Sequence, residues 1–146
     1  MTERLVDTSV LIRRINRKDP EHQLARNAML ALRQKGEDLC IVPQNLYELW
    51  SVCTRPATSN GLGLTPEQSL QVLLHVEELF TLLSDHEDLY SEWKRIVSEY
   101  RVSGRPSHDA RLIAAMNLHG IHALLTFNVQ DFTRYSGLSV LHPREI

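Results

Sequence analysis

The sequence lacks a long hydrophobic run. Although 42% of its 146 residues are hydrophobic, no stretch approaches the roughly 20 consecutive apolar residues that a membrane-spanning helix needs. The first residues, MTERLVDTSVLI, place charged side chains before a short apolar run. No small-residue cleavage site of the kind that ends a signal peptide follows them. We therefore expect no membrane segment and a cytoplasmic protein.

Cysteine is equally scarce, since the chain has only Cys40 and Cys53. Each lies inside an apolar stretch, and their spacing matches no zinc or redox pattern. In a reducing compartment we expect two buried free thiols rather than a disulfide.

An excess of positive charge is also missing. Sixteen basic and eighteen acidic residues leave a formal net charge of −2, whereas domains that hold nucleic acid by bulk electrostatics are usually strongly basic. This balance argues against that class of protein. It does not exclude an enzyme that grips a phosphate through bound metal ions, because a cluster of carboxylates would itself lower the net charge.

Linkers, low-complexity tracts and internal repeats are absent, and the length suits one compact domain. Short apolar strands are expected at residues 5–6, 39–42, 80–83, 123–126 and 139–141, and helices at 21–35, from 43 onward, 66–79, 86–101 and 107–119. Strands that alternate with helices predict βαβ units. The expected fold is α/β, with three α/β/α layers around a central parallel sheet of about five strands, in a single domain over residues 1–146.

Local signals mark the ends of several elements. Thr8 or Ser9 is expected to cap a helix after the first strand, and Ser107 the helix that ends at Gly120. Residues 55–64, RPATSNGLGL, are rich in Pro, Gly, Ser and Asn and are predicted to form a loop.

Four acidic residues stand near the ends of predicted strands or in the helices that follow them. Asp7 directly follows the first strand, Glu48 lies early in the helix after the second, Asp109 lies in the first turn of its helix, and Asp131 follows the strand that ends near Thr126. Loops beyond the carboxyl ends of parallel strands form one rim, where ligands bind. The pattern therefore predicts that the four carboxylates meet at a single edge of the sheet.

Carboxylates gathered in this way raise each other's pKa, and a divalent cation relieves the conflict. Ligands that are all oxygens suit Mg²⁺ or Mn²⁺. Such an ion makes a bound water easier to deprotonate and offsets charge on a phosphate in transfer. The chemistry that this set favours is hydrolysis of a phosphodiester.

Each acid also has an ordinary structural explanation. Asp7 could serve as a helix cap, Asp109 could complement the helix dipole, and Asp131 could form an Asx turn. Glu48 is harder to explain in this way, because a charge among Tyr47, Leu49 and Trp50 is unfavourable unless it faces a cleft. The functional interpretation rests on the coincidence of all four at one rim.

The same residues carry a resemblance to a known family. Val6-Asp7-Thr8-Ser9-Val10 resembles the opening motif of PIN domains, Glu48-Leu49 their second acidic site, and His108-Asp109-Ala110-Arg111 the third. Residues 126–132, TFNVQDF, resemble the closing T-x-N-x-x-D-F motif. The four matches occur in order over residues 5–141, and the chain is most similar to VapC-type toxins of toxin–antitoxin pairs.

This resemblance implies a Mg²⁺- or Mn²⁺-dependent endoribonuclease that forms a homodimer, acts on RNA and is inhibited by a cognate antitoxin. It implies that Asp7, Glu48, Asp109 and Asp131 form the acidic set, with Thr8, Ser9 and Asn128 as polar supports close to it. Arginines at 13, 14, 105, 111 and 134 could steer RNA phosphates. Arg105 and Arg111 flank Asp109 and are the best candidates, although each could be an ordinary surface arginine.

Two other functions remain open at this stage. One is a phosphohydrolase that uses Asp7 as a covalent nucleophile, although position 9 is serine rather than a second aspartate. The other is a catalytically silent PIN-fold module that binds RNA or protein.

Overall fold

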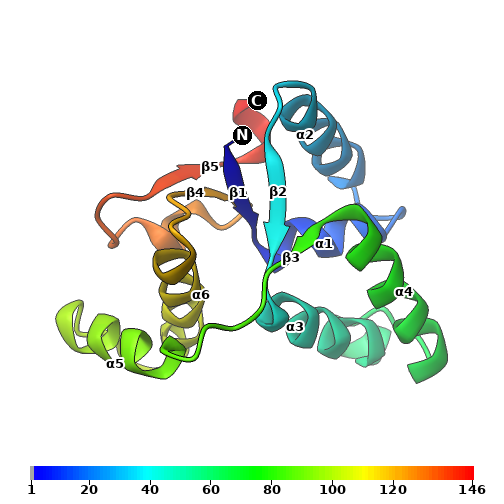
Figure 1. The fold of residues 1–146 in the computed structure, drawn as a ribbon. Coiled ribbons are helices and arrows are strands. Elements are labelled where there is room, and N and C mark those ends of the chain that lie inside the picture. Colours follow the sequence, from blue (N-terminus) through cyan, green and yellow to red (C-terminus); the bar gives the residue numbers. More distant parts are fainter. Residues whose placement is uncertain (1) are drawn as a thin grey trace.

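Five parallel strands form the central sheet (Figure 1). The computed structural model describes residues 2–146, so Met1, with which the predicted domain begins, lies outside the described residues. The strands are β1 (Glu3–Val6), β2 (Asp38–Ile41), β3 (Thr81–Leu82), β4 (Ala123–Leu125) and β5 (Ser139–Leu141), in the order β3-β2-β1-β4-β5. Every neighbouring pair is parallel. The predicted three-layer α/β fold with a five-stranded parallel sheet is confirmed.

Helices cover both faces of this sheet. They are α1 (Thr8–Ile15), α2 (His22–Gln34), α3 (Pro43–Thr54), α4 (Pro66–Leu79), α5 (Leu89–Glu99) and α6 (Pro106–His119), with short 3₁₀ turns η1 (Ala57–Ser59), η2 (Val129–Phe132) and η3 (Pro143–Glu145). Helices α5 and α6 lie on one side, and α1 to α4 on the other (Figure 1).

Successive strand residues feed two separate cores, because side chains alternate between the faces of a sheet. Leu5 and Leu124 pack into the core on the side of α5 and α6. Val6 and Leu125 pack into the core on the side of α1 to α4. Since the central strands are buried on both faces, each contains consecutive apolar residues, such as Leu5-Val6 and Leu124-Leu125.

The helix starts differ from the expected caps. Asp7 occupies the N-cap position and Thr8 is already helical, so the expectation of Thr8 or Ser9 as the cap was wrong. Ser107 is not a cap either, because α6 begins at Pro106, whose fixed φ suits the first helical position. Gly120 ends α6 as predicted, with φ 69° in the left-handed region that favours glycine.

Residues 55–64 form the predicted loop, which folds back onto the end of α3. The Leu62 amide donates to the Val52 carbonyl at 2.9 Å, and the Leu64 amide to the Cys53 carbonyl at 2.8 Å. A side chain at Gly61 would place its Cβ 1.9 Å from the carbonyl oxygen of Arg55, so only glycine fits. The loop therefore fixes the backbone at Arg55, whose carbonyl also accepts from the Gly63 amide at 2.9 Å.

Two further expectations concern the membrane and the thiols. Among residues 2–146, no helix is both long and apolar enough to cross a bilayer. Cys40 and Cys53 are free and buried, as predicted.

Candidate active site

A pocket of about 490 Å³ lies at the edge where the strands end, here called the C-terminal edge of the sheet. It is lined by Asp7, Thr8, Ser9, Ile12, Arg13, Glu48, Ser51, Val52, Arg55, Arg105, Asp109, Asn128, Asp131 and Phe132. The four carboxylates selected from the sequence are all in this set, together with the three polar residues expected beside them. The structure brings all seven of these residues to one edge of the sheet.

Asp7 is the most enclosed of the four acids, with 8% of its surface exposed. Its Oδ2 accepts hydrogen bonds from the hydroxyls of Ser9 at 2.8 Å and Thr126 at 2.7 Å. Burial raises the pKa of Asp7, and these hydrogen bonds act in the opposite direction. Although Asp7 stands at the N-cap of α1, its side chain makes no capping hydrogen bond, so helix capping does not explain this carboxylate.

Thr126 is a residue that the sequence interpretation did not assign to the site. It is fully buried, and its hydroxyl donates to Asp7 while accepting from the Asn128 amide at 2.9 Å. The Ser9 hydroxyl similarly accepts from the Phe127 amide at 3.1 Å. These bonds fix the orientation of the Asp7 carboxylate from α1, through Ser9, and from the end of β4, through Thr126. The signal was present in the closing motif, whose first residue is Thr126.

Glu48 reaches the pocket from the second turn of α3. Its Oε1 accepts from the Thr8 hydroxyl at 2.7 Å and its Oε2 from the Gln44 amide at 3.3 Å. Asn45 is fully buried and donates to the Thr8 hydroxyl oxygen and the Val6 carbonyl, both at 3.2 Å. Its own amide oxygen accepts from the Val42 amide at 2.9 Å. Gln44 and Asn45 were also missed, because neither is acidic and their partners are remote in sequence.

Asp109 and Asp131 complete the acidic set. Asp109 lies in the first turn of α6 and is half-buried, and Asp131 lies in η2 and is exposed. The pKa of Asp109 is raised to about 7, first by burial and then by the negative charges of Asp7, Asp131 and Glu48, while Arg134 opposes the shift. Asp109 therefore experiences the charges of the other three acids, which is the electrostatic conflict expected of a cation site.

Three arginines line the same pocket. Arg13 is held in place, since it donates to the Ser9 carbonyl at 2.9 Å, pairs with Glu21 at 3.3 Å and lies 4.4 Å from the centre of the Phe127 ring. Arg55 comes from the end of α3 and Arg105 from the start of α6, and neither forms an ion pair within residues 2–146. Arg105 was anticipated at this place, whereas Arg55 was not.

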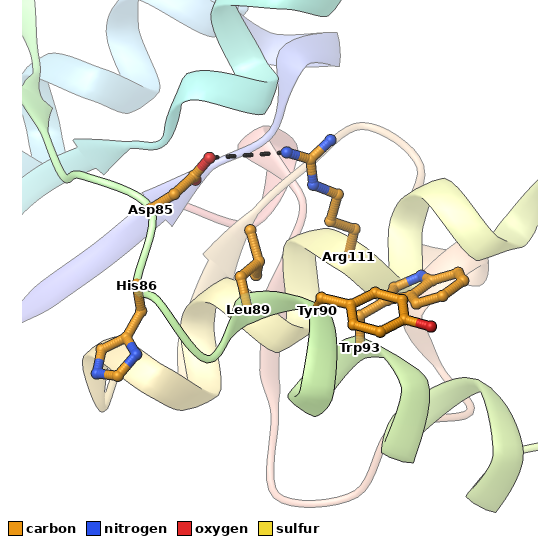
Figure 2. Close-up of a pocket in the computed structure, with 6 residues that line it drawn as sticks. All are labelled: Asp85, His86, Leu89, Tyr90, Trp93 and Arg111. Atoms are coloured by element: carbon orange, nitrogen blue, oxygen red, sulfur yellow. Dashed lines mark ion pairs between the residues drawn. The ribbon is translucent and has the colours of Figure 1, made fainter.

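Arg111, the other arginine favoured from the sequence, lies outside this pocket. It pairs with Asp85 at 3.6 Å and lines a second, more apolar cavity of about 480 Å³ with His86, Leu89, Tyr90 and Trp93 (Figure 2). Two residues along a helix correspond to a rotation of about 200°, so Arg111 and Asp109 face different sides of α6. None of the four acids lines this second cavity.

The four carboxylates at the C-terminal edge suit a hard divalent cation that few of them bind directly. Among residues 2–146, no three of the four acids bring carboxylate oxygens within 4.8 Å of one another; the only such group of potential metal ligands is Glu3, Asp38 and Cys40. Mg²⁺ usually takes one or two direct carboxylate ligands and keeps several waters. The spread of these acids therefore suits direct ligation by few of them, with the others acting through water.

Comparisons with known proteins agree with this architecture. The sequence model of the PIN domain matches residues 4–138. The fold is similar to DNA-bound VapBC from Salmonella typhimurium, at 19% identity, TM-score 0.71 and coverage of 98% of this chain and 99% of that chain. A toxin–antitoxin complex from Klebsiella pneumoniae is 22% identical, with TM-score 0.65 and coverage of 97% and 98%.

A third similar structure is VapC20 from Mycobacterium tuberculosis, described as a toxin that cleaves the sarcin–ricin loop. It is 18% identical, with TM-score 0.59 and coverage of 83% of this chain and 86% of that chain. No curated protein matches the chain in sequence. The structural likenesses concern the fold, whereas the sequence match spans most of the chain: the protein belongs to the PIN-domain family.

Proposed function

We propose that this PIN-domain protein is a metal-dependent endoribonuclease that hydrolyses RNA phosphodiester bonds. The observation that supports the proposal most directly is the electrostatics of the pocket at the C-terminal edge. Four carboxylates from four separate segments line it, and burial together with the charges of the other three acids raises the pKa of Asp109 to about 7. Perturbed carboxylates that share a cleft are typical of sites that act on a ligand.

The cation that suits this set is Mg²⁺ or Mn²⁺, held by Asp7, Asp109, Asp131 and Glu48, directly or through water. When bound, it would supply a water of lowered pKa and offset the negative charge of the phosphate. The donors that line this pocket are carboxylate oxygens without cysteine, and His108 lies beside Glu48, Asp109 and Asp131 only in an adjacent cavity. Zinc, which prefers nitrogen and sulfur ligands in closed sites, is therefore a poorer match.

The protein's own side chains have three tasks in this proposal. The hydroxyls of Ser9 and Thr126 orient Asp7, and that of Thr8 orients Glu48. Arg55 and Arg105 are cations on opposite walls of the pocket, α3 and α6, and suit contacts with RNA phosphates. Such contacts position a strand without selecting its sequence.

We further propose that the protein is the toxin of a toxin–antitoxin pair, that it is cytoplasmic, and that it acts as a homodimer inhibited by an antitoxin protein. Support comes from the similar structures, several of which are toxin–antitoxin complexes. The pocket is open to solvent and lined by both signs of charge, so a protein segment could cover it.

The test is RNA cleavage by the purified protein, freed of any bound protein partner. Single-stranded and hairpin RNAs are incubated with Mn²⁺, Mg²⁺ or EDTA, and Asp7→Asn is compared with Asp38→Asn, an acid at the opposite edge of the sheet. We expect cleavage by the wild type and Asp38→Asn, in Mn²⁺ or Mg²⁺ only, and none by Asp7→Asn.

Two outcomes would overturn the proposal. Equal behaviour of wild type and Asp7→Asn over many RNAs would remove the four-acid mechanism. Binding of RNA in EDTA, with no cleavage under any condition, would indicate a catalytically silent binding module instead.

A further inference from the structure

The two walls of the candidate active site belong to different layers of the fold. Glu48 is carried by α3, whose Leu46 and Leu49 pack into the core on the side of α1 to α4. Asp109 is carried by α6, whose Ala110 packs into the core on the opposite side (Figure 1). Because the two helices share no hydrophobic core, apolar packing does not set the distance between Glu48 and Asp109.

A single side chain bridges these two walls. The amide nitrogen of Gln44, in the first turn of α3, donates to the carbonyl oxygen of His108 on α6 at 2.8 Å. The same nitrogen donates to Oε2 of Glu48 at 3.3 Å. Among residues 2–146, no other hydrogen bond joins α3 to α6. Gln44 is only 7% exposed, so water competes little for these bonds.

Chemistry supports this orientation of the amide. If the group were turned over, its oxygen would face the His108 carbonyl and the Glu48 carboxylate, and three hydrogen-bond acceptors would meet without a donor. Both partners need a donor, and only the amide nitrogen has two N–H groups to give. The position therefore requires glutamine for its donor capacity and its length together.

The other side of Glu48 is fixed independently of α6. Thr8 donates to Oε1, and Asn45 holds Thr8 against the end of β1. Gln44 is thus the remaining element that relates Glu48 to the helix carrying Asp109. Functional groups must be held within about 0.5 Å of their productive geometry, and within residues 2–146 this bridge is the direct hydrogen bond between the two helices that carry Glu48 and Asp109.

We propose that Gln44 is a positioning residue that sets the placement of Glu48 relative to Asp109 across the two layers, and thereby the affinity of the site for its cation. This inference rests on the proposed function, since it concerns the same site. It assigns a role to a neutral residue that does not line the pocket.

The test compares Gln44→Met with wild type. Methionine has similar length and suits a buried position, but it donates no hydrogen bond. Groups that orient metal ligands typically contribute 10- to 100-fold in metal affinity or activity. We expect the Mn²⁺ dissociation constant by calorimetry, and the half-saturating Mn²⁺ concentration in cleavage, to rise by about tenfold or more. At saturating Mn²⁺ the KM for RNA should stay within about twofold of wild type, because the arginines are unchanged.

A matched control is Ser69→Ala, which removes a buried polar group of α4 outside the pocket and should leave Mn²⁺ affinity unchanged. The inference fails if Gln44→Met binds Mn²⁺ as tightly as wild type. It also fails if Mn²⁺ affinity falls only together with the melting temperature, since that would mean general loss of structure. The calorimetric readout needs no RNA, so absence of cleavage by the wild type would refute the proposed function separately.

Discussion

The two edges of the sheet each gather acidic residues, and they differ in an instructive way. At the N-terminal edge, Glu3, Asp38 and Cys40 bring potential ligand atoms within 4.8 Å of one another. At the C-terminal edge, the four pocket carboxylates are more widely spread, yet the charges of Asp7, Asp131 and Glu48 add to burial in raising the pKa of Asp109. By proximity alone, the N-terminal trio would be the better metal site.

The electrostatic environment of the two groups, in contrast, favours the C-terminal edge as the cation site. Burial and the neighbouring Asp38 and Glu3 raise the pKa of the Cys40 thiol to about 12, so the sulfur stays protonated and is a poor ligand. The carboxylate of Asp38 accepts a hydrogen bond from the Thr81 hydroxyl at 2.7 Å, and Glu3 is exposed to water. In the pocket, by contrast, Asp109 faces three like charges, with Arg134 as the opposing cation. Like charges gathered in a cleft therefore favour the C-terminal edge as the candidate cation site, although the ligand atoms at the N-terminal edge lie closer together.

The largest expected effect comes from removing one charge at each edge. Asp109→Asn should reduce RNA cleavage by roughly 1,000-fold or more, since a bound cation contributes several kcal/mol to stabilising the transition state. Asp38→Asn should change it by less than about twofold. Single-turnover cleavage in Mn²⁺ measures both. A comparable loss in the two variants would mean that the N-terminal trio takes part in cation binding and that the contrast between the edges is mistaken.

A matched pair of threonines gives the next comparison. Thr8 donates to Glu48 and Thr81 to Asp38, each at 2.7 Å. Thr8→Val should lower cleavage by about 10- to 100-fold, because it releases a carboxylate of the site from its support. Thr81→Val should leave cleavage unchanged. Melting temperatures of both variants serve as the control, and equal cleavage by Thr8→Val and wild type would show that Glu48 needs no such support.

A smaller effect concerns stability as a function of pH without added cation. The pKa of Asp109 in the folded protein, about 7, lies above its ordinary value of 3.8, so the folded state binds more protons between these values. Stability from this group is therefore present near pH 4, is lost as pH rises toward 7, and stays low above that.

Because Asp109 is only half-buried, the difference amounts to about 1–2 kcal/mol after allowance for screening by solvent. Asp109→Asn should accordingly melt higher than wild type at pH 8 and gain little at pH 4, as measured by thermal denaturation in EDTA. Asp109→Asn and wild type are compared at both pH values in the same buffer. A pH profile of Asp109→Asn that parallels wild type would contradict the assignment of the shift to this carboxylate.

These comparisons also show what the sequence could predict. Strand ends located the four acids, since parallel strands finish at one edge whatever their spacing. The contributions of Gln44 and Thr126 could not be derived in the same way. Gln44 bonds to His108, which is 64 residues away and on the helix of the opposite layer. Thr126 bonds to Asp7, which is 119 residues away and follows the neighbouring strand. The divergence of Arg111 from Asp109, in contrast, followed from helical periodicity and was foreseeable.

The smallest effect is expected at Cys40, where the trio at the N-terminal edge can be tested directly. Its side chain is fully buried and its pKa is about 12, so the thiolate that alkylating reagents attack is almost absent at pH 8. We expect iodoacetamide to modify Cys40 only after the protein is denatured, and added Mn²⁺ to leave this protection unchanged. Mass spectrometry of the modified peptide, with denatured protein as the reference, measures it. Rapid labelling of the native protein, or protection that appears only with Mn²⁺, would mean that Cys40 is accessible or binds the cation, and that the two edges are more alike than their charge balance indicates.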